Sequence, residues 1–189
     1  MANDYDDARA HALRERYTQT FGGVELPVPV ESIAEDLLGL AVEARDLPVS
    51  GMLLPAERRI LVNASEPETR QRFTIAHELG HWICQCLEGS TKPVHCRAED
   101  IGVDPEAKAL EREANIFAAN LAMPAHAVRT SWETIADLDG CARHFDVSRN
   151  AMAWRLYSVG LVNLAPAMHS WEMGPPVHRF PSDETKERL

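Results

Sequence analysis

Aromatic side chains, basic side chains and long apolar runs are all scarce in this sequence of 189 residues. Phe, Trp and Tyr make up only 6% of the chain, so Leu, Ile, Val and Ala must supply most of a core. No run of about 18 apolar residues occurs, and the sequence therefore predicts no membrane-spanning helix. The acidic first seven residues lack the apolar stretch of a secretory signal.

The charge balance is acidic, because 19 Lys and Arg stand against 29 Asp and Glu, for a formal net charge of −10. A general nucleic-acid-binding surface is disfavoured, since phosphate binding depends on clustered Lys and Arg. Cysteine is also rare. Because no secretory signal is seen, we expect a cytoplasmic protein in which all of the cysteines are reduced. The cysteines are Cys84, Cys86, Cys96 and Cys141.

The hydrophobic share of 45% and the charged share of 25% are typical of a globular protein. The length suits one domain with a small appendage. We expect a main domain over residues 1–127, a helical unit over 128–164 and a mobile tail over 165–189. Apolar periodicity and turn residues in the main domain predict an α+β fold. The expected helices span 4–20, 31–38, 65–87 and 104–123, and the expected strands span 40–45, 51–54 and 59–63.

The expected helix at 65–87 contains His77-Glu78-Leu79-Gly80-His81, which fits the pattern H-E-x-x-H. Positions four apart lie on one face of a helix, so the imidazoles of His77 and His81 can bind one Zn²⁺ ion. Glu78 need not bind the metal, because its role is to take a proton from the water that the metal activates and to pass it to a leaving amine. The composition predicts roughly 0.03 chance matches to this pattern. Gly80 is expected to leave room beside the two histidines.

A catalytic zinc site usually has three protein ligands, and the third should come from another element. The expected helix at 104–123 offers Glu106, Glu111 and Glu113. On a helical wheel with Leu110 at the centre of the apolar stripe, Glu113 lies about 60° away, at the border of the packed face, and Glu111 lies about 100° away. Glu106 belongs to the first turn, where acidic residues are common. Glu113 is therefore the first choice for the third ligand, and Glu111 is the second.

Other side chains are weaker candidates for the site. Cys84 follows His81 by three residues, so a thiolate ligand is one alternative, although a small buried side chain is the more common role of a reduced cysteine. The pattern does not identify the group that would stabilise an oxyanion. The candidates for that group are His95, His126, His144 and Tyr157.

Two separate segments of the sequence resemble one known family. RFTIAHELGHW at 72–82 and EREANIFAANLAMP at 111–124 are similar to motifs of the ImmA/IrrE metallo-endopeptidases. The segments at 51–53 and 60–63 resemble the hairpin that precedes the zinc helix in that family. The two motifs occur in the right order, and the resemblance extends over residues 28–160.

The resemblance implies a zincin-like core with a helical unit after it. It also implies that His77, His81 and Glu113 bind Zn²⁺, with Mn²⁺ left open, and that Glu78 is the general base. Members of the family typically cleave a helix-turn-helix repressor, which relieves repression of mobile-element, phage or stress-response genes. Others are partners of such regulators in toxin–antitoxin-like pairs.

Residues 141–156 resemble a helix-turn-helix, with Ala142 and Phe145 facing the core. Arg149 and Arg155 would then be available to DNA phosphates. A packing unit that completes the protease or holds a regulator is favoured over DNA binding, because acidic residues dilute the basic face.

Two alternatives to the peptidase stay open. One is a regulator that binds DNA through residues 138–160, with a metal site that is structural or vestigial. The other is a non-catalytic partner that docks a regulator without cutting it.

Overall fold

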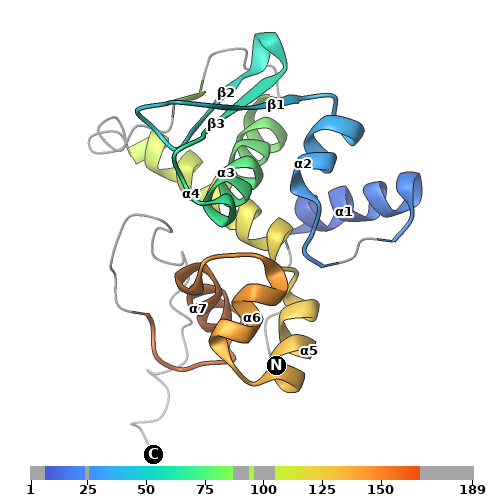
Figure 1. Ribbon diagram of the computed structural model, residues 1–189, viewed down its shortest axis with the longest axis vertical. Helices are drawn as coiled ribbons and strands as arrows, with labels where there is room; N and C mark the ends of the chain where they lie inside the picture. The colour runs from blue at the N-terminus through green and yellow to red at the C-terminus, as the bar shows by residue number, and fades with distance from the viewer. Residues whose placement is uncertain (1–6, 24–25, 87–93, 96–104, 167–189) are drawn as a thin grey trace, which may run out of the picture.

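The structure is a computed structural model that describes residues 7–23, 26–86, 94–95 and 105–166 (Figure 1). The predicted α+β fold is confirmed. The α-helices are α1 (Ala8–Phe21), α2 (Val30–Ser32), α3 (Glu68–His81), α4 (Pro105–Ala122), α5 (Ala125–Ile135), α6 (Leu138–Phe145) and α7 (Arg149–Ser158). The strands are β1 (Ala41–Arg45), β2 (Gly51–Leu54), β3 (Arg59–Asn63) and β4 (Val94–His95). Shorter turns are η1 (Ile33–Leu37), η2 (Pro55–Glu57) and η3 (Trp82–Cys86), and the last of these continues α3 as a wider π-helical turn. Nearly all of the predicted tail lies outside the described residues.

The strands form one small sheet in the order β1-β3-β2-β4. Strands β2 and β3 are antiparallel, with Gly51 opposite Val62, and the η2 turn joins them, so the predicted hairpin is confirmed. Strand β1 pairs with β3 in parallel. Ile60 and Val62 alternate along β3 and are buried, which is the pattern of a strand with one face on the core. That face packs on α3 (Figure 1).

Helix α1 begins after an acidic cap. The carboxylate of Asp7 accepts hydrogen bonds from the backbone amides of Arg9 and Ala10, at 2.9 and 3.2 Å. These bonds satisfy amides that have no partner within the helix, which is why Asp is favoured at this position. The helix packs against α4.

Buried apolar residues form two clusters. The first joins the sheet, α1, α3 and the middle of α4, and includes Leu79 and Phe117. The second joins the end of α4 to α5, α6 and α7, and begins at Ala119. The domain boundary near residue 127 stays a prediction.

The predicted helix-turn-helix-like unit is present in α6 and α7. Asp146 turns the chain at a φ angle of 50°, and the Ser148 hydroxyl caps α7 by accepting a hydrogen bond from the Ala151 amide at 3.1 Å. Ala142 and Phe145 are buried, as expected. The unit is tied to α3 by an ion pair between Arg72 and Asp146 at 2.9 Å.

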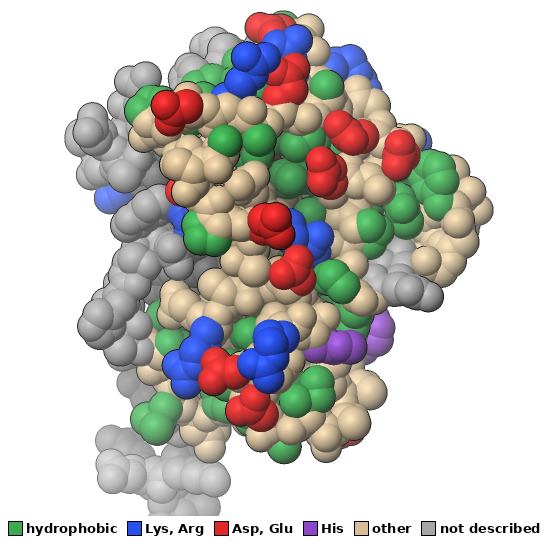
Figure 2. Space-filling model, in the orientation of Figure 1, with side chains coloured by type: hydrophobic (Ala, Val, Ile, Leu, Met, Phe, Trp, Pro, Cys, Tyr) green, Lys and Arg blue, Asp and Glu red, His purple; other side chains and the backbone are tan. Residues whose placement is uncertain are grey.

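Arg155 does not have the exposed position that a phosphate contact requires. It is 4% exposed, and its guanidinium donates hydrogen bonds to the Met123 carbonyl and the Asn120 side-chain oxygen, both at 2.8 Å. The expectation for Arg155 is therefore wrong, because the end of α4 uses its donors. Arg149 is exposed but forms an ion pair with Asp139 at 2.8 Å. On the face drawn in Figure 2, Lys and Arg side chains are interspersed with Asp and Glu.

The described helices include none that combines the length and the apolar character needed to cross a bilayer.

Candidate metal centre

His77 and His81 lie one turn apart on α3, and their rings converge. The two Nε2 atoms are 2.9 Å apart, and the ring planes meet at 83°. His77 is 8% exposed and His81 is fully buried. The spacing of four residues thus places both imidazoles at one point, as the sequence predicts.

Glu111, on α4, completes the group. One carboxylate oxygen lies 3.2 Å from Nε2 of His77, and the other lies 3.2 Å from Nε2 of His81. Burial by itself raises the pKa of this carboxyl, but hydrogen bonds and charge interactions with the two imidazoles outweigh burial and hold the pKa well below its usual range. Glu111 is therefore an anion between the two rings.

The donor set fits a metal ion. A neutral imidazole nitrogen and a carboxylate oxygen are both common zinc ligands, and four ligands at about 2.0–2.1 Å in a tetrahedron lie about 3.3 Å from one another. The nitrogen and oxygen atoms here are 2.9 and 3.2 Å apart, and one ligand atom from each residue falls within 4.8 Å of the others. Three converging electron-pair donors of this kind favour a divalent cation.

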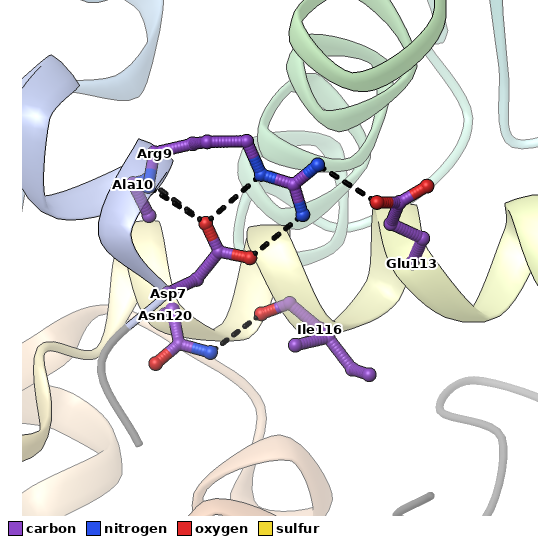
Figure 3. A network of polar contacts seen from close by, with 6 residues as sticks. All are labelled: Asp7, Arg9, Ala10, Glu113, Ile116 and Asn120. Carbon is purple, nitrogen blue, oxygen red and sulfur yellow. Dashed lines mark hydrogen bonds and ion pairs between the residues drawn. The ribbon is translucent and has the colours of Figure 1, made fainter. Parts of the chain in front are cut away.

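Glu113, the first choice from the sequence, lies away from the two histidines, and Glu111 occupies the position predicted for it. Its carboxylate forms an ion pair with Arg9 of α1 at 2.7 Å, as Figure 3 shows. Arg9 also contacts the Asp7 carboxylate at 3.0 Å. Glu113 thus joins α1 to the outer side of α4, while Glu111 points at α3.

The packed face of α4 explains why Glu111, and not Glu113, meets the histidines. Leu110, the reference position of the helical wheel, is 38% exposed. Ala114 and Ala118 are fully buried, and they follow Glu111 by three and seven residues. Positions i, i+3 and i+7 share one face of a helix, so Glu111 belongs to the packed face.

Gly80 sets how closely the two helices approach. A β-carbon on Gly80 would lie 2.9 Å from both the Cα and the carbonyl oxygen of Ala114. The expectation that Gly80 leaves room for metal or substrate is therefore wrong, because the backbone of Ala114 fills that space. The glycine brings the backbone of α4 against α3, which allows the Glu111 carboxylate to reach both histidines.

Glu78 directly follows His77 in α3, and its side chain is fully buried. Its carboxylate is directed toward β2, where a β-carbon on Gly51 would lie 3.1 Å from Oε1 of Glu78 and 2.2 Å from Cγ2 of Thr74. The absence of a side chain at Gly51 thus allows this carboxylate to lie against the strand.

Asn115 contacts the centre and was missed by the sequence reasoning. Its side-chain oxygen lies 3.0 Å from Nδ1 of His77. The signal in the sequence is a polar residue four positions, or about one turn, after Glu111. It lies inside a helix, where Asn is a weak helix former.

The alternative ligand Cys84 and the candidates for the oxyanion-stabilising group have other surroundings. Cys84 is 8% exposed and belongs to the first apolar cluster, not to the three residues whose donor atoms converge. His126 lines a cavity with His11 and Arg14, about 520 Å³ in volume. His144 packs edge-on against its neighbour Phe145, and Tyr157 against Trp154. The side chains of His95, Cys86, Cys96 and Glu106 lie outside the described residues.

The family model for the IrrE N-terminal-like domain of the M78 peptidases matches residues 30–157. The chain belongs to this family. A search of curated proteins finds no match. Among solved structures, a Mycobacterium tuberculosis transcriptional regulator is similar with a TM-score of 0.59 and 23% identity, over 82% of this chain and 48% of that one. The similarity to this regulator shows the fold alone. The present chain spans about half of the regulator's length.

Proposed function

We propose that this chain is a zinc-dependent endopeptidase in which His77, His81 and Glu111 hold the metal ion and Glu78 is the general base. The observation that carries the proposal is the convergence of two imidazole nitrogens from the H-E-x-x-H helix α3 with the Glu111 carboxylate of α4, at neighbouring distances of 2.9 and 3.2 Å. Membership of a peptidase family supports the same reaction. Mn²⁺ is the alternative metal.

A bound Zn²⁺ ion supplies Lewis-acid chemistry, because it polarises a carbonyl oxygen and lowers the pKa of water. The chain supplies the proton transfers. Glu78 accepts a proton as water adds to the scissile carbonyl carbon, and then donates this proton to the amine nitrogen as the C–N bond breaks. Its complete burial and its position against Gly51 limit its movement between these two steps.

We infer that the substrate is a helix-turn-helix repressor, whose cleavage relieves repression of mobile-element, phage or stress-response genes. The resemblance to the ImmA/IrrE motifs supports this choice. The formal net charge of −10 also favours a basic partner such as a DNA-binding protein, because complementary charge accelerates encounter.

The test compares wild-type protein with Glu78→Gln. Both should bind one equivalent of zinc, and only the wild type should convert an added helix-turn-helix repressor into discrete fragments. A chelator should stop the cleavage, and added zinc should restore it. Cleavage by Glu78→Gln at the wild-type rate would show that Glu78 is not the base. Stable complex formation without fragments, in the presence of zinc, would favour the non-catalytic partner instead.

A DNA-binding regulator is the second candidate, and the helix-turn-helix-like arrangement of α6 and α7 is the observation in its favour. The burial of Arg155 and the Arg149–Asp139 ion pair count against it. A salt-dependent mobility shift of DNA by the purified protein alone would support this function.

A further inference from the structure

The His77 ring is contacted at both nitrogens by side chains of α4. Nε2 faces the Glu111 carboxylate at 3.2 Å, and Nδ1 faces the Asn115 side-chain oxygen at 3.0 Å. Glu111 and Asn115 are four residues apart, so they lie on the same face of α4, one turn from each other. A single helix face thus determines how this ring is oriented.

The contact with Asn115 also determines which ring nitrogen carries the proton. An amide oxygen accepts hydrogen bonds and does not donate them, so Nδ1 of His77 must be the donor. In the neutral ring, Nε2 then carries the lone pair, and this lone pair points toward Glu111 and His81. The opposite tautomer would place a proton where a metal ligand needs an electron pair.

We propose that Asn115 is a positioning residue that fixes the tautomer and the ring plane of His77, so that Nε2 is the atom presented to the metal. This inference rests on the metal site of the proposed function, but not on the peptidase reaction. Partners of this kind on the second ring nitrogen are a general feature of histidine ligands.

A purely structural role explains the residue less well. Asn is a poorer helix former than Ala or Leu, and its usual advantage comes from bonds to its own or neighbouring backbone at caps and turns. Asn115 lies in the interior of α4, and its oxygen contacts a different helix. The contact is therefore between elements, at the position where the two helices form the metal centre.

The experiment compares Asn115→Leu with Asn115→Asp in the full-length chain. Leu removes the acceptor, whereas Asp retains an oxygen at the same place. Zinc affinity, measured by competition with a chromogenic chelator, should fall roughly 10- to 100-fold in Asn115→Leu. In Asn115→Asp it should stay within the wild-type range or increase. Asn150→Leu, on α7, is the matched control and should leave zinc affinity unchanged.

A second readout follows the hydrogen bond to Asn115 itself. Long-range proton–nitrogen NMR spectra of the zinc-loaded protein, assigned with His77→Ala, should show a slowly exchanging Nδ1–H proton of His77 in wild type and Asn115→Asp. In Asn115→Leu this proton should exchange faster with solvent. Wild-type affinity and unchanged proton exchange in Asn115→Leu would overturn the proposal, and so would an equal loss of zinc affinity in both variants. If Asn115→Leu does not fold, a folded Asn115→Asp with weakened zinc binding overturns it alone.

The outcomes also separate this inference from the proposed function. A protein that binds zinc but cuts no repressor contradicts the peptidase, while the zinc affinities of the Asn115 variants still decide the role of this residue.

Discussion

A β-carbon on Gly80 would lie 2.9 Å from the Cα atom of Ala114, so the backbones of α3 and α4 are as close at this point as a glycine allows. This contact places Glu111 opposite the two histidines. The metal centre therefore depends on a residue that carries no functional group, because a wider separation of the helices would withdraw the carboxylate.

Replacing Gly80 by Ala should separate the helices. Helix propensity alone favours Ala over Gly by about 1 kcal/mol. We expect the opposite result, a loss of about 1–3 kcal/mol in the free energy of unfolding, because the added methyl group meets backbone atoms that cannot rotate away. Zinc affinity should also fall. Urea unfolding and chelator competition measure the two effects. Gly23→Ala is the control, since a β-carbon there has nothing within 4 Å, and a stabilised Gly80→Ala would contradict the explanation.

Glu111 and Glu113 offer a direct test of which acid belongs to the metal centre. Glu111→Gln removes the charge between the two imidazoles and should greatly reduce the zinc bound per chain, as measured by elemental analysis after dialysis. Glu113→Gln should retain zinc. Its ion pair with Arg9 is partly exposed, so its loss should cost less than about 1 kcal/mol of stability. The reverse pattern of zinc retention would restore Glu113 as the ligand.

The sequence predicts the histidine pair well and the third residue poorly, for a physical reason. The spacing of His77 and His81 lies within one helix, where local geometry alone brings the side chains together. The choice between Glu111 and Glu113 depends on how α4 is rotated against α3, and the Gly80–Ala114 contact decides that rotation. A helical wheel for one helix contains no information about its partner.

Gly51 allows a separate test of how Glu78 is held. In Gly51→Ala the new methyl group would lie 2.2 Å from Cγ2 of Thr74 and 3.1 Å from Oε1 of Glu78. It should therefore displace Thr74 and press on the Glu78 carboxylate. We expect a loss of stability of about 1–3 kcal/mol and slower repressor cleavage, with zinc retained. Adding Thr74→Ser removes the methyl group in the closer contact and should restore part of the stability. Additive losses in the double variant would show that the two positions do not interact.

Asp7 should make the stability of the fold depend on pH in the acid range. Burial raises the pKa of this carboxyl, but the hydrogen bond from the Arg9 side chain and the bonds from the α1 amides outweigh burial, so the pKa in the folded protein is below its ordinary value. A lowered pKa stabilises the fold fully above the usual Asp pKa of about 3.9. This stabilisation is lost as the pH falls through the lower folded-state value.

Asp7→Ala should therefore be less stable than wild type at neutral pH by about 0.5–2 kcal/mol, as expected for the loss of an N-cap. The difference between the two proteins should shrink as the pH is lowered from about 5 to about 2. Chemical unfolding at a series of pH values measures it. A difference that stays constant over this range would mean that the charge of Asp7 does not contribute.

Arg155 and Arg149 are both arginines of α7, yet their removal should cost different amounts of stability. Arg155→Met takes away the donors to the Met123 carbonyl and the Asn120 oxygen inside the protein, which should cost about 1–3 kcal/mol. Arg149→Met removes one side of an exposed ion pair and should cost less than about 1 kcal/mol. Thermal unfolding compares the two variants. Wild-type stability of Arg155→Met would show that the second cluster does not need Arg155 to join it to α4. A mobility shift with DNA that Arg149→Met abolished would show that α7 acts as a recognition helix.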